Sequence, residues 1–110
     1  MASAYEILGQ SAPADTNNAD MFTVPSAHSY VVSSLVVANV TATAATARVF
    51  ARISGATAAT SNAILYDVSV PANSTATFSL GMTFGAADVL TIRSGTASAL
   101  TFTAFGSDVS

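Results

Sequence analysis

The clearest strand pattern of the chain is ATARVFARIS, residues 45–54. Alternate positions from Ala45 to Ile53 are apolar, and the positions between them are mostly polar. A period of two predicts a half-buried β-strand, because successive side chains of a strand point to opposite faces of its sheet. We therefore expect the alanine and valine side of this strand to pack on a core, while Arg48 and Arg52 turn to solvent.

The same alternation recurs along the chain, and no segment shows the 3.6-residue apolar spacing of an amphipathic helix. Further strands are expected at residues 21–24, 30–40, 63–70, 75–80, 89–94 and 100–104. Pro25 and Pro71 each follow a valine at the end of such a strand. Proline cannot donate a hydrogen bond to a strand ladder, so both are expected to mark corners where the chain leaves one sheet. About seven or eight short strands at this spacing predict an all-β fold, a single antiparallel β-sandwich of jelly-roll or immunoglobulin-like outline.

A chain of 110 residues has room for one domain. We expect residues 15–110 to form the sandwich and residues 1–14 to form an extended N-terminal arm. The arm prediction depends on Tyr5, Ile7 and Leu8, which place apolar side chains on both faces of a short extended segment.

The strand expected at residues 30–40 is also apolar at both parities, since Val31, Leu35 and Val37 stand opposite a second set of valines. One interpretation is that the arm and this strand both lie inside the monomer. The other is that one face of each packs on a neighbouring subunit. Under the second interpretation the candidate assembly interface consists of Tyr5, Ile7, Leu8, Val31, Leu35 and Val37.

Charge is scarce in this sequence. Charged residues make up 8% of the chain, against about 25% in an ordinary soluble domain. There is no lysine, and the net charge of −3 excludes the basic stripe that draws nucleic-acid phosphates. Adhesion to an anionic membrane is excluded for the same reason. Exposed strand edges are usually protected by charge, lysine above all, so we expect another copy of the chain to cover these edges.

The two arginines within residues 45–54 flank Phe50 on one strand face. They are candidates to clamp an acidic partner or ligand. The alternative, which we favour, is that Arg48 and Arg52 are solvated beside a partly covered Phe50.

Residues that carry chemistry are few. The absence of cysteine excludes disulfides, zinc–thiolate sites and a cysteine nucleophile. The lone His28 is beside Ser29, but neighbouring side chains of a strand point in opposite directions. The Asp- and Asn-rich residues 15–20 lack the glycine and the distal glutamate of a calcium loop, so they are expected to form a turn. We expect no catalytic residue, no metal and no cofactor, and the chain is not expected to be an enzyme.

The first residues lack the basic and long apolar regions of a secretory signal, and the apolar stretches are too short to cross a bilayer. We therefore expect a protein made in the cytoplasm of its host.

The run AYEILGQSAPA, residues 4–14, resembles the opening of a family of small β-sandwich virion structural proteins of marine tailed phages, cyanophages among them. The resemblance continues through residues 21–26, 31–39, 44–49, 65–75, 87–91 and 102–108. These segments are strand ends and proline turns, so they specify a fold better than an activity.

The resemblance implies a component of a bacteriophage virion that assembles in many copies without a cofactor. The expected role is that of a capsid decoration (cement) protein, a homotrimer that contacts itself and the major capsid protein. A component of the neck, baseplate or tail fibre is the alternative, and a receptor- or glycan-binding module on a fibre is a further one.

Overall fold

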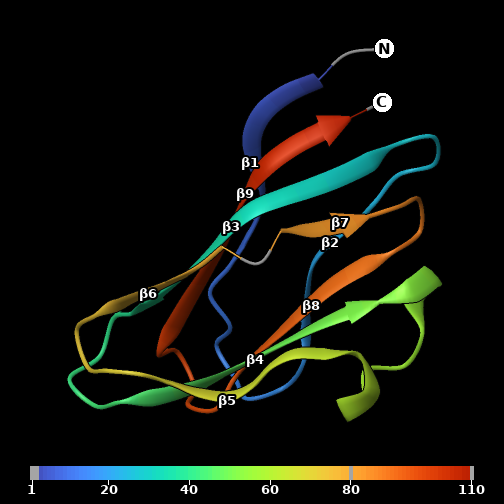
Figure 1. The fold of residues 1–110 in the computed structure, drawn as a ribbon. Helices are drawn as coiled ribbons and strands as arrows, with labels where there is room; N and C mark the ends of the chain where they lie inside the picture. Colours follow the sequence, from blue (N-terminus) through green and yellow to red (C-terminus); the bar gives the residue numbers. More distant parts are fainter. Residues whose placement is uncertain (1–2, 80, 110) are drawn as a thin grey trace.

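Two antiparallel β-sheets pack face to face in the computed structural model, which describes residues 3–79 and 81–109 (Figure 1). The five-stranded sheet contains, in spatial order, β1 (Ser3–Ser11), β9 (Leu100–Val109), β3 (Ser29–Asn39) and β6 (Thr75–Phe78), with β7 (Met82–Phe84) also paired to β3. The four-stranded sheet contains β2 (Ala19–Thr23), β8 (Val89–Ser94), β4 (Ala45–Arg52) and β5 (Ala63–Val70). The only helical segments of the described chain are two short 3₁₀ turns between β4 and β5, η1 (Ile53–Gly55) and η2 (Thr60–Asn62). The predicted all-β sandwich is confirmed.

The strand order distinguishes between the two sandwich outlines that the sequence left open. Within the described chain, every connection crosses to the other sheet except β4 to β5 and β6 to β7. The short strands β6 and β7 pair with opposite halves of β3, so together they occupy the place of one interrupted strand. Eight strand positions joined in this way form a jelly roll, in which two Greek keys wrap around one core.

The two predicted proline corners are confirmed. Pro25 lies between β2 and β3, and Pro71 lies between β5 and β6; in both places the chain crosses from the four-stranded to the five-stranded sheet. Each turn places one residue in the left-handed region, Ala27 at φ 67° and Asn73 at φ 54°. Asparagine tolerates this conformation better than most residues, which suits it to the second corner.

The core fills the space between the sheets, and its alternating residues come from the central strands of both. Its largest fully buried apolar side chains are Phe102, Leu35, Leu90, Ile92 and Leu100. Residues 45–54 contribute Ala45, Ala47 and Val49 to this core, as the alternation of the segment predicted. The strand ends at Arg52, however, and Ile53 is exposed in η1 instead of packing inward.

A β-bulge in β3 explains why this strand is apolar at both parities. The pairing of β3 with β9 slips between Val32 and Ser34, which exchanges the inward and outward positions. Val32 therefore faces the core before the bulge, and Leu35 and Val37 face it after the bulge. Leu35 and Val37 are fully buried within the monomer. They were predicted for the assembly interface, but they pack inside the monomer instead.

The segment expected to be an N-terminal arm is described from Ser3 onward. Ser3–Ser11 forms β1, which pairs with β9 along nearly its whole length (Figure 1). In the monomer this segment is thus the edge strand of the five-stranded sheet. The strand predicted at residues 75–80 is confirmed up to Phe78, and its last residue, Leu80, lies outside the described residues.

Candidate functional site

Four exposed apolar side chains gather on the outer face of the five-stranded sheet. Antiparallel partners point to the same face, and Ile7 of β1 is the partner of Phe105 of β9. Tyr5 and Val31 are both partners of Ser107, one from each neighbouring strand. Tyr5 is 94% exposed, Ile7 53% and Phe105 38%. We call Tyr5, Ile7, Val31 and Phe105 the apolar surface.

Three residues of the apolar surface, Tyr5, Ile7 and Phe105, line a shallow hollow of about 290 Å³. Its lining consists of Tyr5, Glu6, Ile7, Ser33, Phe105 and Gly106. The Ser33 hydroxyl donates a hydrogen bond to the carbonyl oxygen of Phe105 at 3.1 Å. Aromatic side chains around a hollow with little charge are the usual anchors of a protein–protein contact.

The open edge of β1 adjoins the apolar surface. Among the described residues β1 pairs with β9 on one side only, and its nine residues include a single charged one, Glu6. A strand edge presents unpaired N–H and C=O groups, on which another strand can pair. The same side of the molecule therefore offers both apolar side chains and backbone hydrogen-bonding groups.

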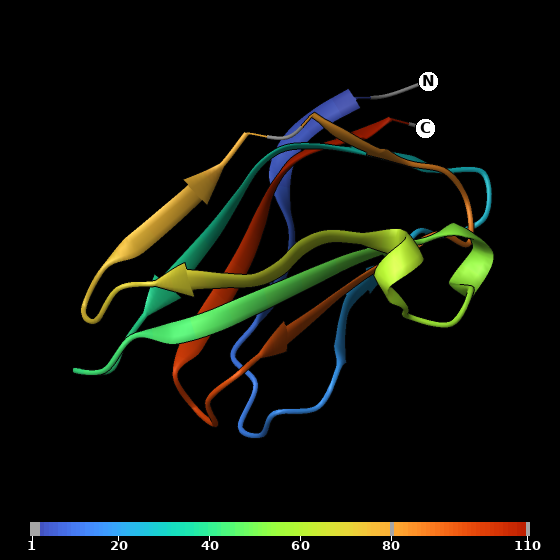
Figure 2. The same ribbon diagram turned by 60° about the horizontal axis from the view of Figure 1, so that its bottom comes forward.

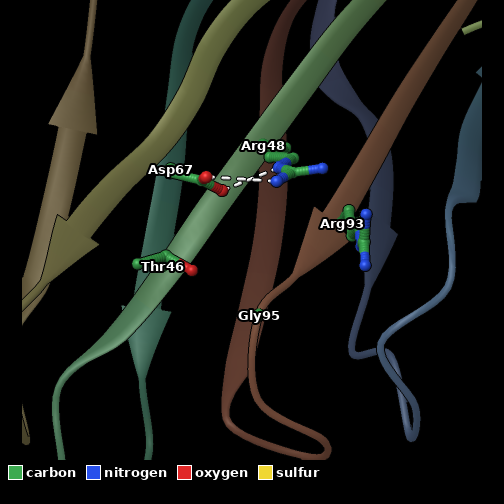
Figure 3. Close-up of a pocket in the computed structure, with 5 residues that line it drawn as sticks. All are labelled: Thr46, Arg48, Asp67, Arg93 and Gly95. Atoms are coloured by element: carbon green, nitrogen blue, oxygen red, sulfur yellow. Dashed lines mark hydrogen bonds and ion pairs between the residues drawn. The ribbon is translucent and has the colours of Figure 1, made fainter. Parts of the chain in front are cut away.

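The outer face of the four-stranded sheet is built differently, around an ion pair (Figure 3). Arg48 donates from Nε to Oδ1 of Asp67 at 2.7 Å and from Nη2 to Oδ2 at 3.1 Å. A bulge in β5 sets Tyr66 and Asp67 together opposite Arg48, because Ala47 pairs with Val68 and the next pair already involves Leu65. The guanidinium of Arg48 lies 4.1 Å from the centre of the Tyr66 ring.

This ion pair shifts the titration of both partners. The hydrogen bond from Arg48, followed by its positive charge and that of Arg93, lowers the pKa of Asp67 despite a partial desolvation that opposes the change. The same hydrogen bond raises the pKa of Arg48. Asp67 adopts φ 55°, a left-handed conformation that aspartate accepts more readily than most residues.

A second arginine lies beside the ion pair. Arg93 of β8 is the direct cross-strand partner of Arg48, and its Nε donates to the carbonyl oxygen of Thr16 at 2.7 Å. Thr46, Arg48, Asp67, Arg93 and Gly95 together line a hollow of about 310 Å³, which we call the charged hollow (Figure 3).

Arg48 and Arg52 do not form the pair that was a candidate to clamp an acidic partner, because each is already paired with an aspartate of this chain. Phe50 lies on the outer face yet is only 4% exposed, because the segment between β4 and β5 folds over this end of the sheet (Figure 2). Arg52 is engaged by that segment, donating to the carbonyl oxygens of Gly55 and Ala56, and it also pairs with Asp20 at 3.0 Å. The interpretation that we favoured, solvated arginines beside a partly covered Phe50, is therefore wrong for Arg52, and Phe50 is buried instead of partly covered.

Another close contact between titratable side chains joins His28 to Asp108, near the described end of β9. His28 Nδ1 is 2.9 Å from Oδ1 of Asp108, which joins the loop before β3 to the end of β9. Burial, with the charges of Asp108 and Glu6, raises the pKa of Tyr30. Asp15 accepts a hydrogen bond from the backbone N–H two residues on, as expected of a turn. In the described segments His, Asp and Glu side chains nowhere gather in threes at metal-binding distance.

No protein-family model matches this chain, and no curated protein matches it either. Within residues 3–79 and 81–109, no helix has the length and apolar character needed to cross a membrane.

The six residues predicted for the assembly interface separate into three groups. Tyr5, Ile7 and Val31 share the apolar surface. Leu8 is half-buried and packs against the core, since it points to the face opposite Ile7. Leu35 and Val37 lie in the core of the monomer. The sequence analysis did not predict Phe105. Phe102 and Ala104 point inward, so Phe105 is an apolar residue at an outward position, and this break in the apolar–polar alternation is visible in the sequence.

Proposed function

We propose that this chain is a virion structural protein, and specifically a capsid decoration protein that stabilises a bacteriophage head. The observation that carries the proposal is the apolar surface beside the open edge of β1. A monomer that leaves an almost fully exposed tyrosine next to an exposed isoleucine and phenylalanine gains stability when another protein covers them.

Two further observations support the proposal. The jelly roll is an architecture of viral capsid and lectin domains, although a fold alone does not specify a function. The sequence resembles small virion structural proteins along most of its length, from residues 4–14 to residues 102–108. Both point to assembly and neither requires chemistry.

The proposed partners are other copies of the chain and the major capsid protein. Closed cyclic symmetry limits growth of the assembly, and a homotrimer is the state we propose. Fully burying an exposed side chain of this kind contributes about 1.5–3 kcal/mol. Ile7 at 53% and Phe105 at 38% exposure gain only the part that is still exposed, so several contacts act together to hold a subunit on a particle. A place in the neck, baseplate or tail fibre would use the same surface and is the alternative.

The experiment measures the number of copies in purified particles relative to the major capsid protein. Decoration predicts a copy number comparable to that of the major capsid protein, whereas a few copies per particle would contradict it and favour the neck or tail. The double variant Ile7→Ser, Phe105→Ser should fold but lose incorporation. Ile53→Ser is the matched control, because Ile53 is exposed on a different part of the molecule.

A further inference from the structure

The charged hollow carries a positive charge that no side chain of the described residues neutralises. Arg48 and Arg93 are directly opposed on adjacent strands, an arrangement of like charges that is destabilising. Asp67 neutralises one of them through two hydrogen bonds. The described part of the chain places no carboxylate within ion-pair distance of Arg93. The three side chains therefore sum to one positive charge.

Both guanidinium groups are held in place, which leaves defined donors for a ligand. Asp67 occupies Nε and Nη2 of Arg48, and the remaining nitrogen points away from Asp67, on the side of the sheet where Arg93 lies (Figure 3). The Nε of Arg93 is bound to the carbonyl oxygen of Thr16, so its two terminal nitrogens stay available. Fixed guanidinium donors match the two oxygens of a carboxylate and lose little entropy when they bind it.

We propose that the charged hollow is a binding site for a small carboxylate-bearing ligand. A net charge of +1 favours a monoanion, because Asp67 would repel the second negative charge of a phosphate dianion. The volume of about 310 Å³ is near the lower end of ligand sites, which suits a ligand of roughly one sugar ring. The Thr46 hydroxyl adds a group that binds hydroxyls, whereas the Gly95 N–H already donates to the carbonyl oxygen of Thr46 at 2.8 Å. This site is on the opposite sheet from the apolar surface, so it is independent of the proposed assembly.

The test titrates the protein with sodium glucuronate, acetate, glucose and phosphate at constant ionic strength near pH 7, since salt screens exposed charges. The readout is the NMR shift of the arginine Nε–H groups and of the Gly95 amide. Saturable shifts with glucuronate and none with glucose are expected. Equal binding of acetate identifies a simple organic acid as the ligand class, and tighter binding of glucuronate identifies a sugar acid; both results support the site.

Two variants separate a specific site from general attraction. Arg93→Gln should weaken glucuronate binding at least about tenfold, the loss expected for one charge-assisted bidentate contact. Thr77→Glu changes the net charge by the same amount at an exposed position on β6 and should leave the affinity unchanged. The proposal is overturned if neither carboxylate binds, if glucose or phosphate binds as tightly as glucuronate, or if the two variants behave alike.

Discussion

The two outer faces of the sandwich differ in how they meet solvent. All three arginines of the chain lie in strands of the four-stranded sheet, Arg48 and Arg52 on β4 and Arg93 on β8. The strands of the five-stranded sheet contain no cation, and their outer face carries the apolar surface instead.

This difference shows on which side of the molecule the strand edges are protected against pairing with other chains. On the four-stranded sheet the edge strands β2 and β5 bear Asp20 and Asp67, each paired with an arginine, and a loop covers one end of the face. Charges and covering loops are the usual protection of strand edges. The five-stranded sheet leaves β1 with little of either. From the sequence we expected poorly protected strand edges without knowing where they lie. In the structure they lie mainly on the side of β1.

The largest difference in stability is expected between two alanine variants, each of which replaces a phenylalanine on one outer face. Phe50→Ala should lower the free energy of unfolding by about 3–5 kcal/mol, because it empties the space beneath the covering loop. Phe105→Ala, at 38% exposure on the other face, should cost roughly 1 kcal/mol or less. Urea denaturation of both variants measures the difference. Equal losses would mean that the two faces are equally covered.

A smaller effect is expected at the backbone beneath the apolar surface. A Cβ at Gly106 would overlap the carbonyl oxygen of Val31 beside the β3 bulge. Gly106→Ala should therefore destabilise the protein by about 1–3 kcal/mol through forced displacement of β3.

Gly85→Ala serves as the control, because a Cβ there meets only ordinary contacts and should change the stability by less than roughly 0.5 kcal/mol. A fully stable Gly106→Ala protein would show that the bulge does not depend on this glycine.

The smallest effect concerns the ion pair of the four-stranded face. The pKa of Asp67 lies below its ordinary value of 3.8, so the folded state binds this proton less readily than the unfolded state. The stabilising contribution is complete above pH 3.8 and is lost as the pH falls through the lower, folded pKa. An NMR titration of the carboxyl carbons should show the pKa of Asp67 rising toward its ordinary value in Arg48→Gln. An unchanged pKa in that variant would contradict the ion pair.

The sequence predicted the sandwich well because its signals are local. Period-two alternation located β4, β5 and β8 to within a few residues, and two Val-Pro steps located both corners. The three-residue strand β7 escaped detection, since so short a segment has almost no period to read.

The candidate sites were harder to predict, because they depend on which strands become neighbours. The bulge after Val32 exchanged the faces of β3, so that two of its three predicted interface residues entered the core. Arg48 was linked in the sequence to Arg52, four residues away, whereas the fold places it against Arg93 and Asp67. Only the registers of β4 with β8 and β5 make that juxtaposition, and no local pattern encodes it.

The proposed assembly face is the outer face of the five-stranded sheet. Tyrosine labelling tests it directly, because Tyr5 lies on that face, Tyr66 is beside Arg48 on the other, and the half-buried Tyr30 provides an internal reference. The labelling rates are compared between the monomer and the assembled particle. We predict that assembly protects Tyr5 while Tyr66 stays reactive. Protection of Tyr66 with an unchanged rate at Tyr5 would contradict the account.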